Sequence, residues 1–214
     1  MKKCPKCGSK RVAPILYGLP AFSEELEQKL NNEELYLGGC CVSHCDPSFH
    51  CFDCGKDVGT PPVLISKRGE EDYRSIVTAV RFCDGGYFGG HDEVIIRKTS
   101  AGTIMDCHPS FCRDVLPISR EMTEREWSKL LNRLFCKLYV HEWKKTYDDP
   151  HVLDGEQWGL EFQLTGRRVR NYGGSNAFPA YWAELKRTFA PFLKECPPML
   201  GAELLCNCEE PNAR

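Results

Sequence analysis

The stretch that decides the fold of the first part of the chain is Cys4-Pro5-Lys6-Cys7-Gly8, which recurs as Cys51-Phe52-Asp53-Cys54-Gly55. Two cysteines separated by two residues can direct both sulfurs at one ion from a tight turn. The glycine after the second cysteine allows the open backbone conformation, often with positive φ, that such a turn requires. Two such turns predict one structural zinc per chain, Zn²⁺, bound by Cys4, Cys7, Cys51 and Cys54 with no open coordination position.

The two cysteine pairs are separated by 43 residues. Zinc ribbons usually have about 15–20 residues between their pairs, so the sequence predicts an insertion that extends from the ribbon. Ser23, followed by Glu24 and Glu25, is typical of a helix start, and Leu26 and Leu30 would share one face of that helix.

Further cysteines and histidines leave the choice of ligands open. Cys40, Cys41, His44, Cys45 and His50 lie within the insertion, and Cys206-Asn207-Cys208 lies near the end of the chain. One of them could replace a cysteine of the two pairs, or a group of them could bind a second metal. The pattern is more typical of small buried side chains and surface histidines.

Composition and charge place the protein among soluble globular chains. The 214 residues carry a net charge of −2, and 42% of them are hydrophobic. Met1-Lys2-Lys3-Cys4 leads into polar residues, and no segment has the ~20 apolar residues of a membrane span. We therefore expect a cytoplasmic protein without membrane association, in which paired cysteines indicate metal binding rather than disulfides.

The charge balance also argues against nucleic-acid binding as a property of the whole chain, because that binding depends on neutralising phosphates. One local exception is the basic start of the chain, which has no acidic residue before Glu24. Its members are Lys2, Lys3, Lys6, Lys10 and Arg11. Basic residues also offset the negative charge of a zinc–thiolate centre, so nucleic-acid binding here is an alternative and not the first interpretation.

The remaining sequence predicts a second, α+β domain. Thr60-Pro61-Pro62 marks a hinge between a zinc ribbon at 1–60 and a domain at 63–195, and 196–214 has the composition of a tail. Strands are expected at Ser75–Phe82, ending in a turn at Asp84-Gly85-Gly86, and at 94–97 and 103–105. This order predicts an antiparallel sheet.

Two main helices and a strand pair complete the predicted domain. Thr123 and Glu126 match a capping box, and apolar residues recur behind them at helical spacing over about 124–139. Trp158–Leu164 alternates as a strand, with 167–172 as its hairpin partner. The second helix is expected to open at Pro179 and to weaken near Pro191.

Two segments of the second domain could carry chemistry. Acidic residues surround a histidine between Tyr147 and Trp158, so His151, Asp154 and Glu156 could form an acid–base or metal cluster. The Gly173-Gly174-Ser175-Asn176 segment could hold a phosphate before a helix. An exposed turn at Asp154-Gly155 and a structural turn at 173–176 are the simpler interpretations, and no complete catalytic group is recognised.

The chain resembles a group of uncharacterised bacterial proteins that have an N-terminal CPxCG zinc ribbon and an α+β domain of unknown function. The matching segments of the first half are 4–8, Tyr17-Gly18-Leu19-Pro20, Gly38-Gly39-Cys40 and 51–55. In the second half they are Asp154-Gly155-Glu156-Gln157-Trp158 and Gly174-Ser175-Asn176-Ala177-Phe178-Pro179, followed by Trp182. The resemblance supports the two-domain division and a bacterial cytoplasmic origin, and implies no activity.

The sequence thus favours a non-enzymatic zinc-binding protein that presents a surface to a protein or small-molecule partner. Two alternatives stay open: a nucleic-acid-binding zinc ribbon, and an enzyme with a site near His151 and Asp154.

Overall fold

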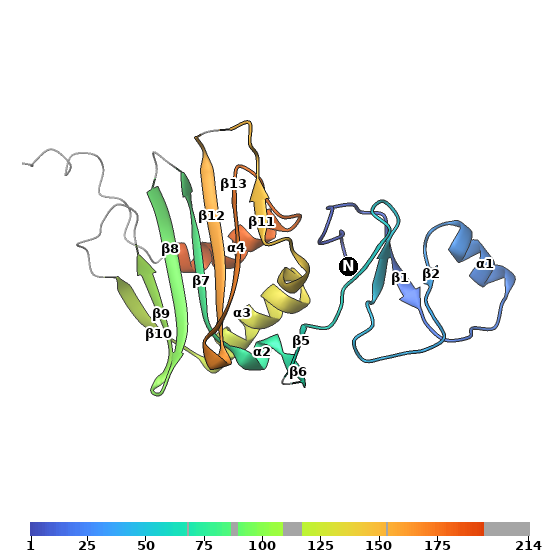
Figure 1. Cartoon of the computed structure of the whole chain (residues 1–214), viewed down its shortest axis with the longest axis horizontal. Coiled ribbons are helices and arrows are strands. Elements are labelled where there is room, and N and C mark those ends of the chain that lie inside the picture. The colour runs from blue at the N-terminus through green and yellow to red at the C-terminus, as the bar shows by residue number, and fades with distance from the viewer. Residues whose placement is uncertain (68, 87–89, 109–116, 153, 195–214) are drawn as a thin grey trace, which may run out of the picture.

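The polypeptide forms a small sheet, a two-stranded hairpin and a large sheet, in that order along the chain (Figure 1). A computed structural model describes residues 1–67, 69–86, 90–108, 117–152 and 154–194. The architecture is α+β, and most of the strand pairs are antiparallel. Within the described residues, no helix has the length and apolarity needed to cross a bilayer.

The small sheet belongs to residues 1–60, which we call the ribbon region. Its strands lie in the order β2-β1-β3-β4. They are β1 (Val12–Leu16), β2 (Tyr36–Leu37), β3 (Phe49–Cys51) and β4 (Lys56–Val58). Helix α1 (Glu24–Asn31) follows β1 and begins after Ser23, whose side chain accepts a hydrogen bond from the amide of Leu26. This confirms the helix predicted in the insertion.

The rest of the described chain, residues 63–194, is called the sheet region. It opens with the hairpin of β5 (Val63–Ser66) and β6 (Gly69–Asp72), followed by the short helix α2 (Tyr73–Ile76). The large sheet has seven strands in the order β10-β9-β8-β7-β12-β13-β11. They are β7 (Val77–Gly86), β8 (Gly90–Thr99), β9 (Gly102–His108), β10 (Ile118–Met122), β11 (Thr146–Asp148), β12 (Glu156–Leu164) and β13 (Arg168–Ser175).

Two longer helices, α3 (Glu124–Cys136) and α4 (Trp182–Leu193), pack on one face of this sheet (Figure 1). Phe82 of β7 stacks on Phe189 of α4 at 4.4 Å, and Phe162 of β12 meets Phe135 of α3 at 5.0 Å between ring centroids. The register of β7 and β12, together with the alternation of side chains along each strand, places Phe82 and Phe162 on the same face of the sheet. Both helices therefore cover that face. Short 3₁₀ turns occur at Val140–Glu142 and Thr165–Arg167.

The structure confirms the α+β class and the positions of both main helices. Thr123 and Glu126 make both hydrogen bonds of the capping box at the start of α3. Helix α4 starts at Trp182, after Pro179, and Pro191 lies inside the helix, which continues to Leu193. Strands β12 and β13 pair as expected around Thr165-Gly166. The domain limits 1–60 and 63–195 stay predictions, and the predicted tail lies outside the described residues.

Two details of the predicted first strand are wrong. Ser75 and Ile76 belong to α2 and not to a strand, because the Asp72 side chain caps this turn by accepting a hydrogen bond from the Arg74 amide at 2.8 Å. Asp84, Gly85 and Gly86 continue β7 and do not form a turn. A Cβ on Gly85 would lie 1.8 Å from the carbonyl oxygen of Gly90, so glycine is needed there for close strand approach.

The contacts that join the ribbon region to the sheet region include two sets of hydrogen bonds and ion pairs, besides the pairing of His44 with Glu70. At the first, the Lys3 side chain pairs with Glu184 at 3.2 Å, and the Tyr181 hydroxyl donates to the Lys3 carbonyl at 2.7 Å. At the second, the amide and hydroxyl of Thr60 donate to the buried carboxylate of Glu142 at 2.6 and 2.8 Å. The ring of His141 lies 3.1 Å from the Thr60 carbonyl oxygen.

Candidate metal centre

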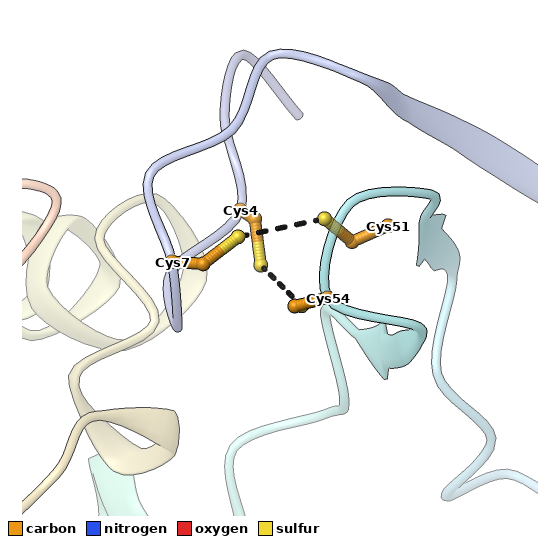
Figure 2. Close-up of side chains that lie close together, drawn as sticks. All are labelled: Cys4, Cys7, Cys51 and Cys54. Carbon is orange, nitrogen blue, oxygen red and sulfur yellow. Dashed lines mark hydrogen bonds between the residues drawn. The ribbon is translucent and has the colours of Figure 1, made fainter.

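The two cysteine pairs of the ribbon region adopt the same turn and face each other (Figure 2). In the first turn the Gly8 amide donates to the Cys4 carbonyl at 2.9 Å, and in the second the Gly55 amide donates to Cys51 at 2.8 Å. Gly8 and Gly55 have φ values of 81° and 63°. These are the positive values that the glycine after each second cysteine was expected to supply.

The turns bring four sulfurs together. The Sγ atoms of Cys4 and Cys54 are 3.8 Å apart and those of Cys7 and Cys51 are 3.6 Å apart, and all four lie within 4.8 Å of one another. Cys4 and Cys51 are fully buried beside Val58, while Cys7 is exposed. This group of four thiols could hold a metal ion.

The electrostatics of the group favour a cation among the sulfurs. Burial raises the pKa of Cys4 to about 12 and also raises the pKa of Cys54. Burial acts in the same direction on Cys51, but the backbone amides of Cys54 and Asp53 outweigh it and lower its pKa. A metal ion binds cysteine as the thiolate, so its binding here would displace the protons of these thiols.

Charged neighbours brace the two turns against each other. The Asp53 carboxylate, between Cys51 and Cys54, accepts hydrogen bonds from Ser9 and from Arg11, the latter at 2.6 Å. Arg11 also pairs with Glu33 at 2.5 Å. These contacts join the chain after the first cysteine pair to the loop of the second, so part of the basic start of the chain serves the ribbon itself.

The ion pairs made by these basic residues bear on the alternative function, nucleic-acid binding. Of the five basic residues at the start, Arg11 is paired with two carboxylates and Lys3 is paired with Glu184. Lys2, Lys6 and Lys10 are exposed or partly exposed on the ribbon region. The local positive charge available to a phosphate chain is therefore smaller than the sequence implies.

The other thiols and imidazoles of the insertion lie outside this group. Cys40 and Cys41 are exposed. His50 stacks on Tyr36 at 3.7 Å and pairs with Asp57 at 2.7 Å. His44 and Cys45 come together with Glu70, a residue that the sequence reasoning did not single out. Cys206 and Cys208 lie outside the described residues.

The residues considered for catalysis do not converge. His151 and Asp154 are exposed, and in the described part of the chain no hydrogen bond or ion pair joins the side chains of His151, Asp154 and Glu156. Gly173, Gly174 and Ser175 belong to β13, where they pair with β11 and β12. The structural turn expected at 173–176 is therefore wrong for 173–175, because these residues are extended within a sheet. Asn176 follows the strand with a φ of 56°, and none of the four residues opens a helix.

Glu156 instead faces a lysine and a second carboxylate, a group that sequence reasoning missed. The Lys186 ammonium lies 3.0 Å from Glu156 and 3.2 Å from Asp84. Burial and a hydrogen bond with Glu156 raise the pKa of Asp84, and one of its carboxylate oxygens, Oδ1, is buried with no hydrogen-bond partner among the described residues. No spacing in the sequence relates α4 to β7, so only the fold brings Lys186 to Asp84.

Beside this group lies a hollow of about 370 Å³ between β7 and α4. Its lining combines apolar side chains with charged ones of both signs. The lining residues are Phe82, Asp84, Lys186, Arg187, Ala190, Leu193 and Lys194.

Among the cysteines that the structure describes, Cys107 is disulfide-bonded, and those of the metal group are free. This departs from the expectation that the cysteines of this chain would be free of disulfides.

No protein-family model matches the chain, and no curated protein matches it. The site is therefore interpreted from its own geometry.

Proposed function

We propose that this chain is a zinc-binding protein in which Cys4, Cys7, Cys51 and Cys54 hold one structural zinc. Zinc binds four thiolates tetrahedrally at about 2.3 Å, which sets neighbouring sulfurs about 3.8 Å apart. Two of the six sulfur–sulfur separations, 3.6 and 3.8 Å, fit that arrangement before any adjustment, and all four sulfurs lie within 4.8 Å of one another. The sulfur geometry is the single observation that carries this proposal.

A zinc held by four cysteines has no position for water or substrate, which is the arrangement of structural and not of catalytic sites. Its role is to keep the two turns together. The ribbon region needs such support, because its buried cluster consists of Cys4, Cys51 and Val58 with a few partly buried neighbours, while Ala13 and Leu26 are buried outside this cluster. We therefore assign the zinc to folding and look for function on the surface that the ribbon presents.

That surface carries large apolar side chains that the protein leaves in solvent. Leu19, Phe22 and Val42 are 92%, 74% and 67% exposed, and we call them the ribbon loop patch. The loops that carry them adjoin, because the Gly18 amide donates to the Gly39 carbonyl and the Tyr17 hydroxyl to the Pro47 carbonyl. Exposed apolar groups on adjoining loops are typical of protein-binding sites, so the proposed partner is a protein that covers this patch.

The partner surface is tested by site-specific photocrosslinking of the full chain in cells. Benzoylphenylalanine placed at position 22 or 19 is expected to give a discrete cross-linked adduct. The same group at position 28, an exposed site of α1 that lies outside the patch, is the control and is expected to give none. Equal adducts from position 28, or no adduct from positions 19 and 22, would contradict the assignment.

A second candidate function is binding of a small molecule by the sheet region. The hollow beside Asp84 and Lys186 is lined by apolar side chains, by Lys194 and by charged residues that form ion pairs, which suits a ligand with an apolar body and one charged group. The Asp84 Oδ1 atom has no partner in the described part of the chain, which favours this interpretation, since buried polar atoms normally have a hydrogen-bond partner.

Octanoate is a simple probe for this hollow. In NMR titrations of the zinc-loaded protein, shifts are expected in residues of β7 and α4. Ala190→Trp, which fills the hollow, is expected to abolish them, while Ala183→Trp, on an exposed position of the same helix, is expected to preserve them. Shifts that persist in Ala190→Trp, or that are absent from the unmodified protein, would count against this second function.

A further inference from the structure

A second group of potential metal ligands lies where the insertion of the ribbon region meets the β5–β6 hairpin. His44, Cys45 and Glu70 place a ring nitrogen, a sulfur and a carboxylate oxygen within 4.8 Å of one another. The His44 Nε2 and Glu70 Oε2 atoms are 2.5 Å apart. The Cys45 thiol also lies within hydrogen-bonding reach of Glu70. Three different ligand types thus converge from segments 25 residues apart in the sequence.

The backbone on both sides holds these side chains in place. In the turn at 43–46, the Asp46 carboxylate accepts hydrogen bonds from the amide and hydroxyl of Ser43 at 2.6 and 2.8 Å. On β6, Glu71 pairs with Arg168 of the large sheet at 2.6 Å. Neighbouring residues of a strand point to opposite faces, so Glu71 anchors the hairpin to the sheet region while Glu70 faces the ribbon region.

The chemistry of these three ligands suits a transition metal. Imidazole, thiolate and carboxylate all bind zinc, at about 2.0–2.3 Å. Ligand atoms of a tetrahedral ion are then about 3.3–3.8 Å apart, and side chains exposed to this degree reach that spacing by small rotamer changes. Glu70 brings one negative charge, and the Cys45 thiolate brings a second once its proton is displaced.

We propose that His44, Cys45 and Glu70 form a second metal site, distinct from the four-cysteine group, that binds a divalent transition ion of the zinc type. With three protein ligands the fourth position is open to water or to a group from outside. Because His44 and Glu70 are exposed and Cys45 is half-buried, the ion exchanges more readily than an ion of the four-cysteine group, in which Cys4 and Cys51 are fully buried. Binding would fasten the insertion of the ribbon region to the β5–β6 hairpin.

The test is the number of zinc ions per chain, measured by native mass spectrometry of the full-length protein in a zinc buffer. We expect two ions on the unmodified chain and one on Cys45→Ser and on Glu70→Gln. Cys41→Ser removes a neighbouring exposed thiol, serves as the matched control, and is expected to keep two. His44→Gln is the further variant, expected to keep one, should either of the first two fold poorly.

The outcomes separate this proposal from the four-cysteine site. One ion on the unmodified chain, unchanged in the three ligand variants, would overturn the second site and leave the first intact. A second ion that persists in Cys45→Ser and Glu70→Gln would belong to other thiols and would also overturn it. Loss of the second ion in the control Cys41→Ser would also overturn the proposed second site.

Discussion

The ribbon region and the sheet region are held together by different means. In the ribbon region the buried cluster consists of two cysteines and one valine. In the sheet region, aromatic and aliphatic side chains from the large sheet and from α3 and α4 form one continuous core. Burial of apolar surface stabilises a domain in proportion to its area. We therefore expect the first region to depend on the proposed metal and the second region not to, and each prediction below tests that contrast.

The largest effect is expected from Cys51→Ser, which removes a buried ligand of the metal group. Structural zinc in small modules contributes on the order of 10 kcal/mol of apparent folding free energy. We expect loss of this zinc and rapid amide exchange throughout residues 1–60, while the large sheet keeps its protection. Hydrogen exchange with mass spectrometry measures both regions at once.

The control for that experiment is Cys136→Ser, which removes a partly buried thiol at the end of α3. It is expected to leave the zinc content and the exchange of residues 1–60 unchanged. If Cys51→Ser unprotected the large sheet to the same degree as the ribbon, the two regions would share one folding unit and the contrast would be wrong.

The converse change is Leu134→Ala in α3. Leu134 is fully buried among the residues of the core, and truncation of such a leucine costs about 2–5 kcal/mol, because it removes apolar contacts and leaves a cavity. Urea unfolding is expected to show this loss for the sheet region, and the zinc content of the folded protein is expected to stay unchanged. A decrease in the free energy of unfolding of less than about 1 kcal/mol would show that packing of α3 does not stabilise the core.

An intermediate effect is expected at the junction of the two regions. Burial lowers the pKa of His141 from its ordinary value of 6.5. The unfolded chain then binds a proton that the folded chain does not, so stability is full above about pH 6.5 and falls as the pH drops toward the lowered pKa. The slope from this one group is at most about 1.4 kcal/mol per pH unit.

Comparison of His141→Gln with the unmodified chain isolates the contribution of His141 to the pH dependence of stability, because any loss of metal in acid affects both proteins alike. We expect its urea-unfolding stability to depend less on pH between about pH 5 and 7 than that of the unmodified chain. Identical pH dependence in the two proteins would show that His141 is protonated as readily in the folded state as in the unfolded state.

The smallest effect is expected from Thr123→Ala at the start of α3. The Thr123 hydroxyl accepts a hydrogen bond from the Glu126 amide, and loss of such a cap costs about 1 kcal/mol. Ser23→Ala is the matching change at α1 in the ribbon region. If the metal governs the ribbon, the threonine change lowers the stability of the sheet region, while the serine change leaves the zinc content unaltered. A change in zinc content with Ser23→Ala would contradict that view.

The elements that sequence reasoning predicted well are those set by local chemistry. The two cysteine turns, the capping box at Thr123 and Glu126 and the alternation of Trp158–Leu164 each follow from neighbouring residues. The error at Asp84-Gly85-Gly86 arose because tertiary packing decides the conformation there. The glycines after Asp84 have the composition of a turn but permit close approach of two strands, and this depends on partners distant in sequence.

The same distinction holds for the sites. The four cysteines come from two copies of one local motif, so the sequence alone predicted that they form one site. The pairing of Lys186 with Asp84 and Glu156, and the convergence of Glu70 on His44 and Cys45, depend on how strands and helices pack. No spacing within one segment relates these residues, and sequence reasoning therefore placed its catalytic hypothesis at His151 and Asp154, which the fold leaves exposed.

The measurement that tests the central claim most directly is the zinc content and thiol reactivity of Cys45→Ser, purified without added metal. This variant removes the proposed second site, so only the four-cysteine group is measured. We predict one zinc per chain, with Cys4, Cys7, Cys51 and Cys54 protected from alkylation until the metal is chelated. A chain without metal, in which these four thiols react at once, would contradict the account.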